Sequence, residues 1–169
     1  TAGDLIVKFP VYRDSYQLPE YERMMALYEQ IHALTKAGII KTAYALGYGG
    51  ICEAVSTMGF GNGLGANLDP KAVSSGELFV PEYGAILACV SKEDLEKITA
   101  DHIVIGLVNA SGDITYGEVR IGAKEALDAW KKPLEKVFPT DSGVGQKEIA
   151  PIIYREKQIY INKNRVAKP

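Results

Sequence analysis

The sequence is poor in the residues that build metal and redox sites. It has only two cysteines and two histidines in 169 residues. Cys52 and Cys89 are far apart and form no CxxC pair. Because their spacing fits no metal-ligand pattern, we expect no metal site and two reduced thiols that behave as small apolar residues. We expect neither His32 nor His102 to act in catalysis.

The sequence also lacks an excess of charge of either sign and any long apolar run. It carries 19 basic and 21 acidic residues, a net charge of −2, and so shows no basic footprint for nucleic acid or for an anionic membrane surface. No apolar run approaches the ~18–20 residues that span a bilayer. The first residues, TAGDLIVKFP, lack the pattern of a signal peptide. We therefore expect a cytoplasmic protein whose partners include neither nucleic acid nor a membrane.

The residues that are present suit an ordinary globular domain, since 47% are hydrophobic and 24% are charged. In the first half, apolar and β-branched runs predict strands over 4–12 and 39–46. Helices are predicted over 18–38, with Gly38 at its C-terminal cap, and over 49–58. The buried face of the first helix is expected to consist of Tyr21, Met24, Met25, Tyr28, Ile31 and Thr35.

In the second half, a short strand is predicted over 64–69, and two strands interrupted by Pro81 over 77–90. A helix follows over 91–100, and a last helix over 123–138, which Pro133 should kink or end in its first part. Two strands over 102–110 and 114–122 are expected to form a tight hairpin through Ser111, Gly112 and Asp113. This order predicts an α+β fold, a mixed sheet with helices packed on it that is partly ferredoxin-like.

Two glycine-rich segments are candidates for a nucleotide site. GFGNGLG, residues 59–65, follows a helix rather than opening one and has no Gly-Lys-Ser/Thr, so it matches neither a dinucleotide fingerprint nor a P-loop. We expect it to form a helix C-terminal turn with positive φ at Gly59 and Gly61.

The other segment, ALGYGGI, lies between a strand and a helix N-terminus, where free backbone N–H groups attract anions. Its Gly47, Tyr48, Gly49 and Gly50, with Glu82 nearby across the sheet, are therefore weak candidates for cofactor binding. Backbone donors could hold a phosphate, whereas Mg²⁺ needs carboxylate oxygens that the segment lacks. The alternative is that these glycines only allow the helix to pack tightly on the sheet.

The segments GGICEAVSTMGFGNGLGANLD and LFVPEYGAI resemble the C-terminal domain of the aminoimidazole ribonucleotide synthetase superfamily. The similarity is strongest to the phosphoribosylformylglycinamidine synthase family, whose members carry two copies of this unit before a glutaminase domain. The final segment, INKNRVAKP, resembles the chain just before that glutaminase domain. The resemblance implies that residues 1–139 are the second copy and that residues 140–169 are a tail or linker.

The sequence departs from the family where the family binds its ligands. The family's His-Asp pair falls on Tyr44 and Ala45, and its Glu, Ser and Gln fall on Pro81, Glu82 and Tyr83. These departures imply a degenerate ligand site with no catalytic residue and no metal ligand. The copy is therefore expected to be structural.

The resemblance also implies a function for the parent protein. It would be an ATP-dependent C–N ligase of purine biosynthesis that uses Mg²⁺ and, as a glutamine amidotransferase, ammonia from glutamine. The fragment alone is predicted to be inactive and to bind no cofactor tightly, its partners being the ATP-binding half and the glutaminase domain. The alternatives are a free-standing scaffold or interaction module, or another superfamily member such as selenophosphate synthetase or a thiamine monophosphate kinase.

A homodimer of the fragment is a further expectation. We expect the helices around Tyr28, Val55 and Trp130 to cover one face of the sheet. The strands 86–90 and 102–110 are apolar at nearly every position, which predicts burial on both faces. The second face should then dock against partner domains or against another copy of the chain.

Overall fold

The computed structural model describes residues 1–140. The chain divides into two compact units, Thr1–Pro133 and Leu134–Pro169, and the helices and strands described below belong to the first. Residues 141–169 of the predicted tail, INKNRVAKP included, lie outside the described residues. The boundary expected at residue 139 therefore stays a prediction.

The first unit is built on a seven-stranded sheet in the order β2-β4-β1-β5-β3-β6-β7. Neighbouring strands are antiparallel except β3 and β6, which are parallel. The predicted α+β class with a mixed sheet is therefore confirmed. The strands are β1 (Leu5–Phe9), β2 (Ile40–Ala45), β3 (Gly65–Leu68), β4 (Ile86–Val90), β5 (Ile103–Asn109), β6 (Ile114–Tyr116) and β7 (Val119–Ile121).

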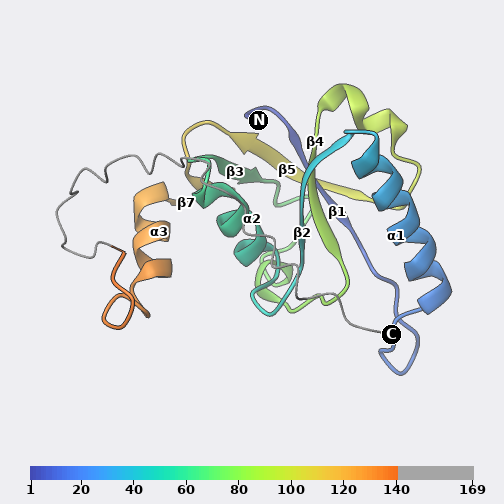
Figure 1. Ribbon diagram of the computed structural model, residues 1–169, viewed down its shortest axis with the longest axis horizontal. Coiled ribbons are helices and arrows are strands. Elements are labelled where there is room, and N and C mark those ends of the chain that lie inside the picture. The colour runs from blue at the N-terminus through green and yellow to red at the C-terminus, as the bar shows by residue number, and fades with distance from the viewer. Residues whose placement is uncertain (141–169) are drawn as a thin grey trace, which may run out of the picture. The chain divides into compact units, whose positions relative to one another are not determined.

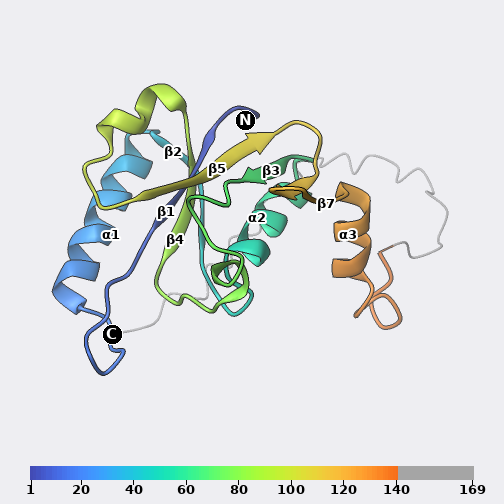
Figure 2. The same ribbon diagram turned by 180° about the vertical axis from the view of Figure 1, so that it is seen from behind.

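Two helices, α1 (Tyr21–Lys36) and α2 (Gly50–Phe60), cover opposite faces of this sheet (Figures 1 and 2). The alternation along β4 shows why both faces are apolar. Leu87 and Cys89 belong to the core that includes α2, whereas Ala88 and Val90 belong to the core that includes α1. The strand β4 is thus buried on both faces by helices of the same chain.

This arrangement corrects the expected docking face. Tyr28 packs in the core beneath α1 and Val55 in the core beneath α2, so the helices do not share one side of the sheet. Trp130, expected to cover the same face, is 62% exposed, and its ring packs 5.5 Å from that of Phe60. The apolar pattern correctly indicated burial of β4 on both faces. It was wrong for part of β5, where Ile103 is 40% exposed, and the expected open face is covered at β4 by α1 or α2.

The buried stripe of α1 agrees with the expected one at Tyr28 and Ile31, which pack in the core, and differs elsewhere. Leu27 and Ile31 are its buried residues, while Tyr21 and Met25 are 62% and 55% exposed. Several apolar stripes satisfy a helical period in this segment, so periodicity alone did not identify the face that the sheet would cover. Thr35 donates its hydroxyl hydrogen bond to the Ile31 carbonyl within the helix, at 2.8 Å.

The predicted hairpin between β5 and β6 is wrong, because β3 lies between these two strands. The residues 114–122 instead form their own hairpin, β6–β7, which turns at Gly117 with φ +57°. The two-residue turn of Gly117 and Glu118 was hidden in a run that alternates like a single strand. Local alternation does not reveal which strand is the neighbour.

Three other elements are shorter or tighter than predicted. The first expected strand of the Pro81 region is a 3₁₀ turn, η1 (Glu77–Phe79). The helix expected over 91–100 is a 3₁₀ helix, η2 (Lys92–Lys97), although Ser91 does cap it by accepting the Asp94 N–H. The last helix, α3 (Ala123–Lys131), ends before Pro133, as expected of a proline, because a continuing helix would lose a hydrogen bond there.

The glycines of GFGNGLG serve the fold, but not as expected. Positive φ is found at Gly63, at +62°, whereas Gly61 has φ −69° and Gly59 lies inside α2. Gly59 packs against the Leu64 carbonyl, and Gly65 against the Asp113 carbonyl, too closely for a Cβ atom. This stretch therefore lets α2, β3 and the chain before β6 approach one another.

Two further sequence expectations concern the cysteines and the membrane. Cys52 is half-buried and Cys89 is buried, and both are free thiols, as predicted. Burial raises the pKa of each. Over the described part of the chain, no helix combines the length and apolar character needed to cross a bilayer.

Candidate functional site at the glycine turn

The turn of Gly47, Tyr48 and Gly49 joins β2 to α2 at one end of the sheet. The same end holds the start of β4, because the Leu46 N–H donates to the Ala85 carbonyl at 2.8 Å. Figure 1 shows this turn beside the coil of η1, at the lower end of the view. The structure thus places the turn next to the segment that contains Glu82.

A carboxylate of the chain itself occupies the anion position of the turn. Glu53, in the first turn of α2, accepts the Gly49 N–H at Oε2 over 2.7 Å. The same oxygen would lie only 3.7 Å from a Cβ atom at Gly47. A phosphate approaching these N–H groups would meet a negative charge where the helix N-terminus would otherwise attract it.

Gly50 is required by the packing of α2 rather than by a ligand. Its φ is +62°, a left-handed conformation that side chains disfavour. A Cβ atom there would lie 2.7 Å from the Val80 carbonyl oxygen and 3.0 Å from that of Leu78. The glycine therefore allows the start of α2 to lie directly against the backbone of η1.

Glu82 pairs with a buried lysine instead of facing the turn. The Lys8 Nζ lies 3.2 Å and 3.1 Å from the two carboxylate oxygens of Glu82. Lys8 is only 6% exposed, in the middle of β1. A buried ammonium requires a counter-ion, so the structure assigns Glu82 to this pairing.

The rest of residues 82–85 is held just as firmly. Arg13 donates to the Tyr83 carbonyl at 2.7 Å, and the Tyr28 hydroxyl donates to the Gly84 carbonyl at 2.8 Å. With the Ala85 carbonyl bound to β2, each of these four residues has a partner. The segment that binds ligands in the resembled family is here part of the packed structure.

These residues do not fit the ATP and Mg²⁺ that the resembled family would imply. Among the carboxylates near the turn, Glu53 accepts from Gly49, Glu77 accepts from Ser74, and Glu82 neutralises Lys8. Within residues 1–140 no group of three His, Cys, Asp or Glu side chains is arranged to hold a metal ion. We therefore derive no phosphoryl-transfer step at this site.

Sequence reasoning missed both Glu53 and Lys8, although each left a signal. Glu53 stands four residues after Gly49, a spacing at which an acidic side chain can reach back to cap a helix. Lys8 is the one charge within the apolar run LIVKF of β1. A charge inside a buried strand indicates that an opposite charge is brought to it by the fold.

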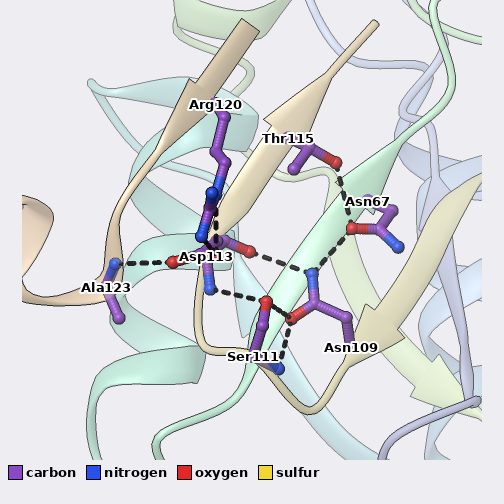
Figure 3. Close-up of polar contacts among 7 residues, drawn as sticks. All are labelled: Asn67, Asn109, Ser111, Asp113, Thr115, Arg120 and Ala123. Atoms are coloured by element: carbon purple, nitrogen blue, oxygen red, sulfur yellow. Dashed lines mark hydrogen bonds and ion pairs between the residues drawn. The ribbon is translucent and has the colours of Figure 1, made fainter. Parts of the chain in front are cut away.

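A second polar cluster lies at the opposite end of β5 (Figure 3). The Asn109 Oδ1 accepts from the backbone N–H and hydroxyl of Ser111, at 3.1 and 2.9 Å. Asp113 accepts from the Arg120 guanidinium and from the Ala123 N–H at the start of α3. The hydrogen bonds from Arg120, and next that from Ala123, hold the pKa of Asp113 below its usual value.

The same network extends onto β3. Asn109 Nδ2 donates to the Asn67 Oδ1 at 2.7 Å, and the Thr115 hydroxyl donates to the same oxygen at 3.0 Å. These contacts fix the connection from β5 past β3 to β6. Because the cluster's polar groups bind one another, its role is structural.

Comparison with known proteins agrees with this fold. No protein-family model matches the sequence. A structure of Thermotoga maritima PurL complexed with AMPPCP is similar, with a TM-score of 0.60 and 20% identity over 75% of this chain and 26% of the PurL chain. Another T. maritima structure, of phosphoribosylformylglycinamidine synthase II, has a TM-score of 0.62 and 18% identity, with the same coverage.

A hydrogenase maturation protein also has a similar structure. Escherichia coli HypE matches with a TM-score of 0.55 and 15% identity, over 72% of this chain and 49% of the HypE chain. The chain spans about a quarter of the PurL chains that it matches. These similarities confirm the resemblance at the level of the fold: the chain has the aminoimidazole ribonucleotide synthetase-like fold.

Proposed function

We propose that the chain is a structural domain of a phosphoribosylformylglycinamidine synthase-type protein, the second of its two copies. The order of motifs from the glycine turn to LFVPEYGAI supports this choice, as does the similarity of the fold to PurL. The T. maritima PurL structures include complexes with ATP, ADP and FGAR. The parent protein would accordingly be an ATP- and Mg²⁺-dependent ligase of purine biosynthesis that takes ammonia from glutamine.

The main support for a structural role is the position of the Glu53 carboxylate at the glycine turn. Glu53 accepts the Gly49 N–H that a phosphate would need. This contact supports the proposal that the weak candidate site at Gly47, Tyr48, Gly49 and Gly50 does not bind phosphate. Glu82, the remaining candidate, is paired with Lys8. The domain keeps the glycines and the apolar core and supplies no group for phosphoryl transfer.

Amide chemical shifts measured during titration with ADP, with and without Mg²⁺, test this proposal. The native chain should show no saturable shifts at residues 47–50. Glu53→Gln, which removes the negative charge, should permit weak binding that does not depend on Mg²⁺. Glu118→Gln, in the exposed turn between β6 and the edge strand β7, is the matched control and should behave as the native chain. Tight, Mg²⁺-dependent binding by the native chain would show that a nucleotide site survives.

The parent protein can be identified from the gene. A glutaminase-like sequence encoded after Pro169 would support the proposed parent and its partners, the glutaminase domain and the ATP-binding half. A stop codon at that place would favour a free-standing scaffold or interaction module. Relatives such as selenophosphate synthetase lack a following glutaminase, so the same observation distinguishes them from the proposed parent. We also propose that the parent protein is cytoplasmic.

A further inference from the structure

Six large apolar side chains are exposed at the end of the sheet that carries the glycine turn. We call them the sheet-end surface. They come from the β1–α1 connection, from the turn itself and from the chain around η1. Their exposed fractions are Tyr16 82%, Leu18 53%, Tyr48 81%, Phe79 66%, Val80 52% and Tyr83 58%.

Hydrogen bonds and close packing hold the three segments of this surface next to one another. Arg13 donates to the Gln17 carbonyl at 3.0 Å and to the Tyr83 carbonyl at 2.7 Å. Gly50, two residues after Tyr48, packs against the backbone of residues 78–80. Figures 1 and 2 show the three connections at the same end of the sheet. Aromatic side chains gathered in this way are typical of protein interfaces.

The charge of these segments is strongly one-sided. Residues 10–23, 46–53 and 77–85 contain six acidic and two basic residues, and one of the six, Glu82, is neutralised by Lys8 of β1. The acidic Glu20, Glu22, Glu53 and Glu77 are exposed. Such a surface favours a partner with positive charge and disfavours anions.

An arginine of the chain itself already binds an aromatic ring and a carboxylate at this end of the sheet. The Arg23 guanidinium lies 3.3 Å from the centre of the Tyr12 ring and pairs with Asp101 at 2.9 Å. Arginine combines stacking on an aromatic ring with ion pairing to a carboxylate, which lysine does less well. Exposed tyrosines beside exposed acidic side chains offer both interactions.

We propose that the sheet-end surface binds an arginine-rich segment of a partner protein. A second copy of the chain is a poorer occupant, because two surfaces of the same negative charge would face each other. The inference does not depend on the parent enzyme, since it rests on exposed aromatic and acidic side chains of this domain.

The test compares three peptides of the same length added to the full chain. Gly-Arg-Arg-Gly-Arg-Arg-Gly should shift the amides of residues 16–18, 48–50 and 79–83 in a saturable manner, and added salt should weaken it. The lysine version should bind more weakly, by about threefold or more. The citrulline version, which keeps the shape but not the charge, should not bind.

Variants locate the site. Tyr48→Ala and Tyr83→Ala should each weaken the arginine peptide about two- to fivefold, with an unchanged melting temperature because both side chains are exposed. Val119→Ala removes an equally exposed apolar side chain, 61% accessible on β7, and should bind as the native chain does. Equal loss in this control, equal binding of the lysine peptide or shifts confined to other regions would overturn the proposal. So would self-association of the chain that Tyr48→Ala abolishes, since a second copy would then be the occupant.

Discussion

Replacing Gly50 by alanine tests directly whether the glycine turn serves the fold or a ligand. The residue has φ +62° and lies against the backbone of η1, so an added methyl group meets two obstacles. One is the left-handed conformation, and the other is the Val80 carbonyl oxygen, 2.7 Å from the new Cβ atom. Neither obstacle involves a bound molecule.

The expected loss of stability can be estimated from these two terms. A left-handed conformation costs a residue with a Cβ atom about 1–2 kcal/mol. Displacing packed neighbours adds about 1–3 kcal/mol, because the crowded atoms belong to backbone. We therefore expect Gly50→Ala to lower the free energy of unfolding by about 3 kcal/mol, a large part of the ~5–15 kcal/mol typical of a domain.

The matched control is Gly61→Ala, at the other end of α2. Gly61 has φ −69°, and nothing lies within 4 Å of a Cβ atom there. A glycine in an ordinary conformation with open space gains stability on substitution, about 0.4–1 kcal/mol, because the unfolded chain loses freedom. The two substitutions should thus change stability in opposite directions.

Urea unfolding followed by circular dichroism measures both variants. The midpoint should fall for Gly50→Ala and rise slightly for Gly61→Ala, with an unchanged slope. If Gly50→Ala were as stable as the native chain, the packing argument would fail and a ligand role for the turn would regain support. Equal destabilisation by both substitutions would show that the close contact to Val80 is not the cause.

Three further predictions concern buried polar groups. Glu82→Ala should lower the free energy of unfolding by about 2–3 kcal/mol, because it leaves the Lys8 ammonium buried without a partner. Lys8→Met should lower it less, because Glu82 can still reach water. Urea midpoints that fall equally for the two variants would contradict this difference. Hydrogen bonds from Arg120 hold the folded pKa of Asp113 below its usual value, so the stability that this carboxylate contributes is present above its unfolded pKa and is lost as the pH falls through the folded pKa. Melting temperatures measured from neutral to acid pH should therefore fall less steeply for Asp113→Asn than for the native chain, and parallel curves would be evidence against the coupling. The buried thiol of Cys89, whose pKa is raised by burial, should react with iodoacetamide only as fast as the chain opens, and prompt labelling detected by mass spectrometry would show that it is accessible.

Local patterns in the sequence were sufficient for most elements. The helices α1 and α2 and the strands β1 to β5 follow from apolar periodicity, and Gly38, with φ +74°, ends α1 as its position predicted. Ser91 caps the following turn for the same local reason. The residues 92–97 nevertheless form a 3₁₀ helix, because the capping signal marks where a turn starts but not how tightly it winds.

The candidate site could be located from the sequence but not interpreted. A glycine-rich turn between a strand and a helix places backbone donors at a known position. Whether those donors are free depends on Glu53, whose side chain could equally have extended into solvent. In the structure, this carboxylate lies against the turn and accepts the Gly49 N–H.

The sequence by itself determined most of the elements, the near balance of charge and the departures from the resembled family's motif at Tyr44 and Ala45, because these are properties of adjacent residues and of residue type. Only the tertiary structure decided that α1 and α2 lie on opposite faces, that β3 separates β5 from β6, and that Lys8 meets Glu82, 74 positions along the chain. The physical reason is that an apolar face or a buried charge requires a partner but does not specify which residue or element that partner is. Which partner it finds depends on how all the strands and helices pack at once, a choice that no local stretch of sequence contains.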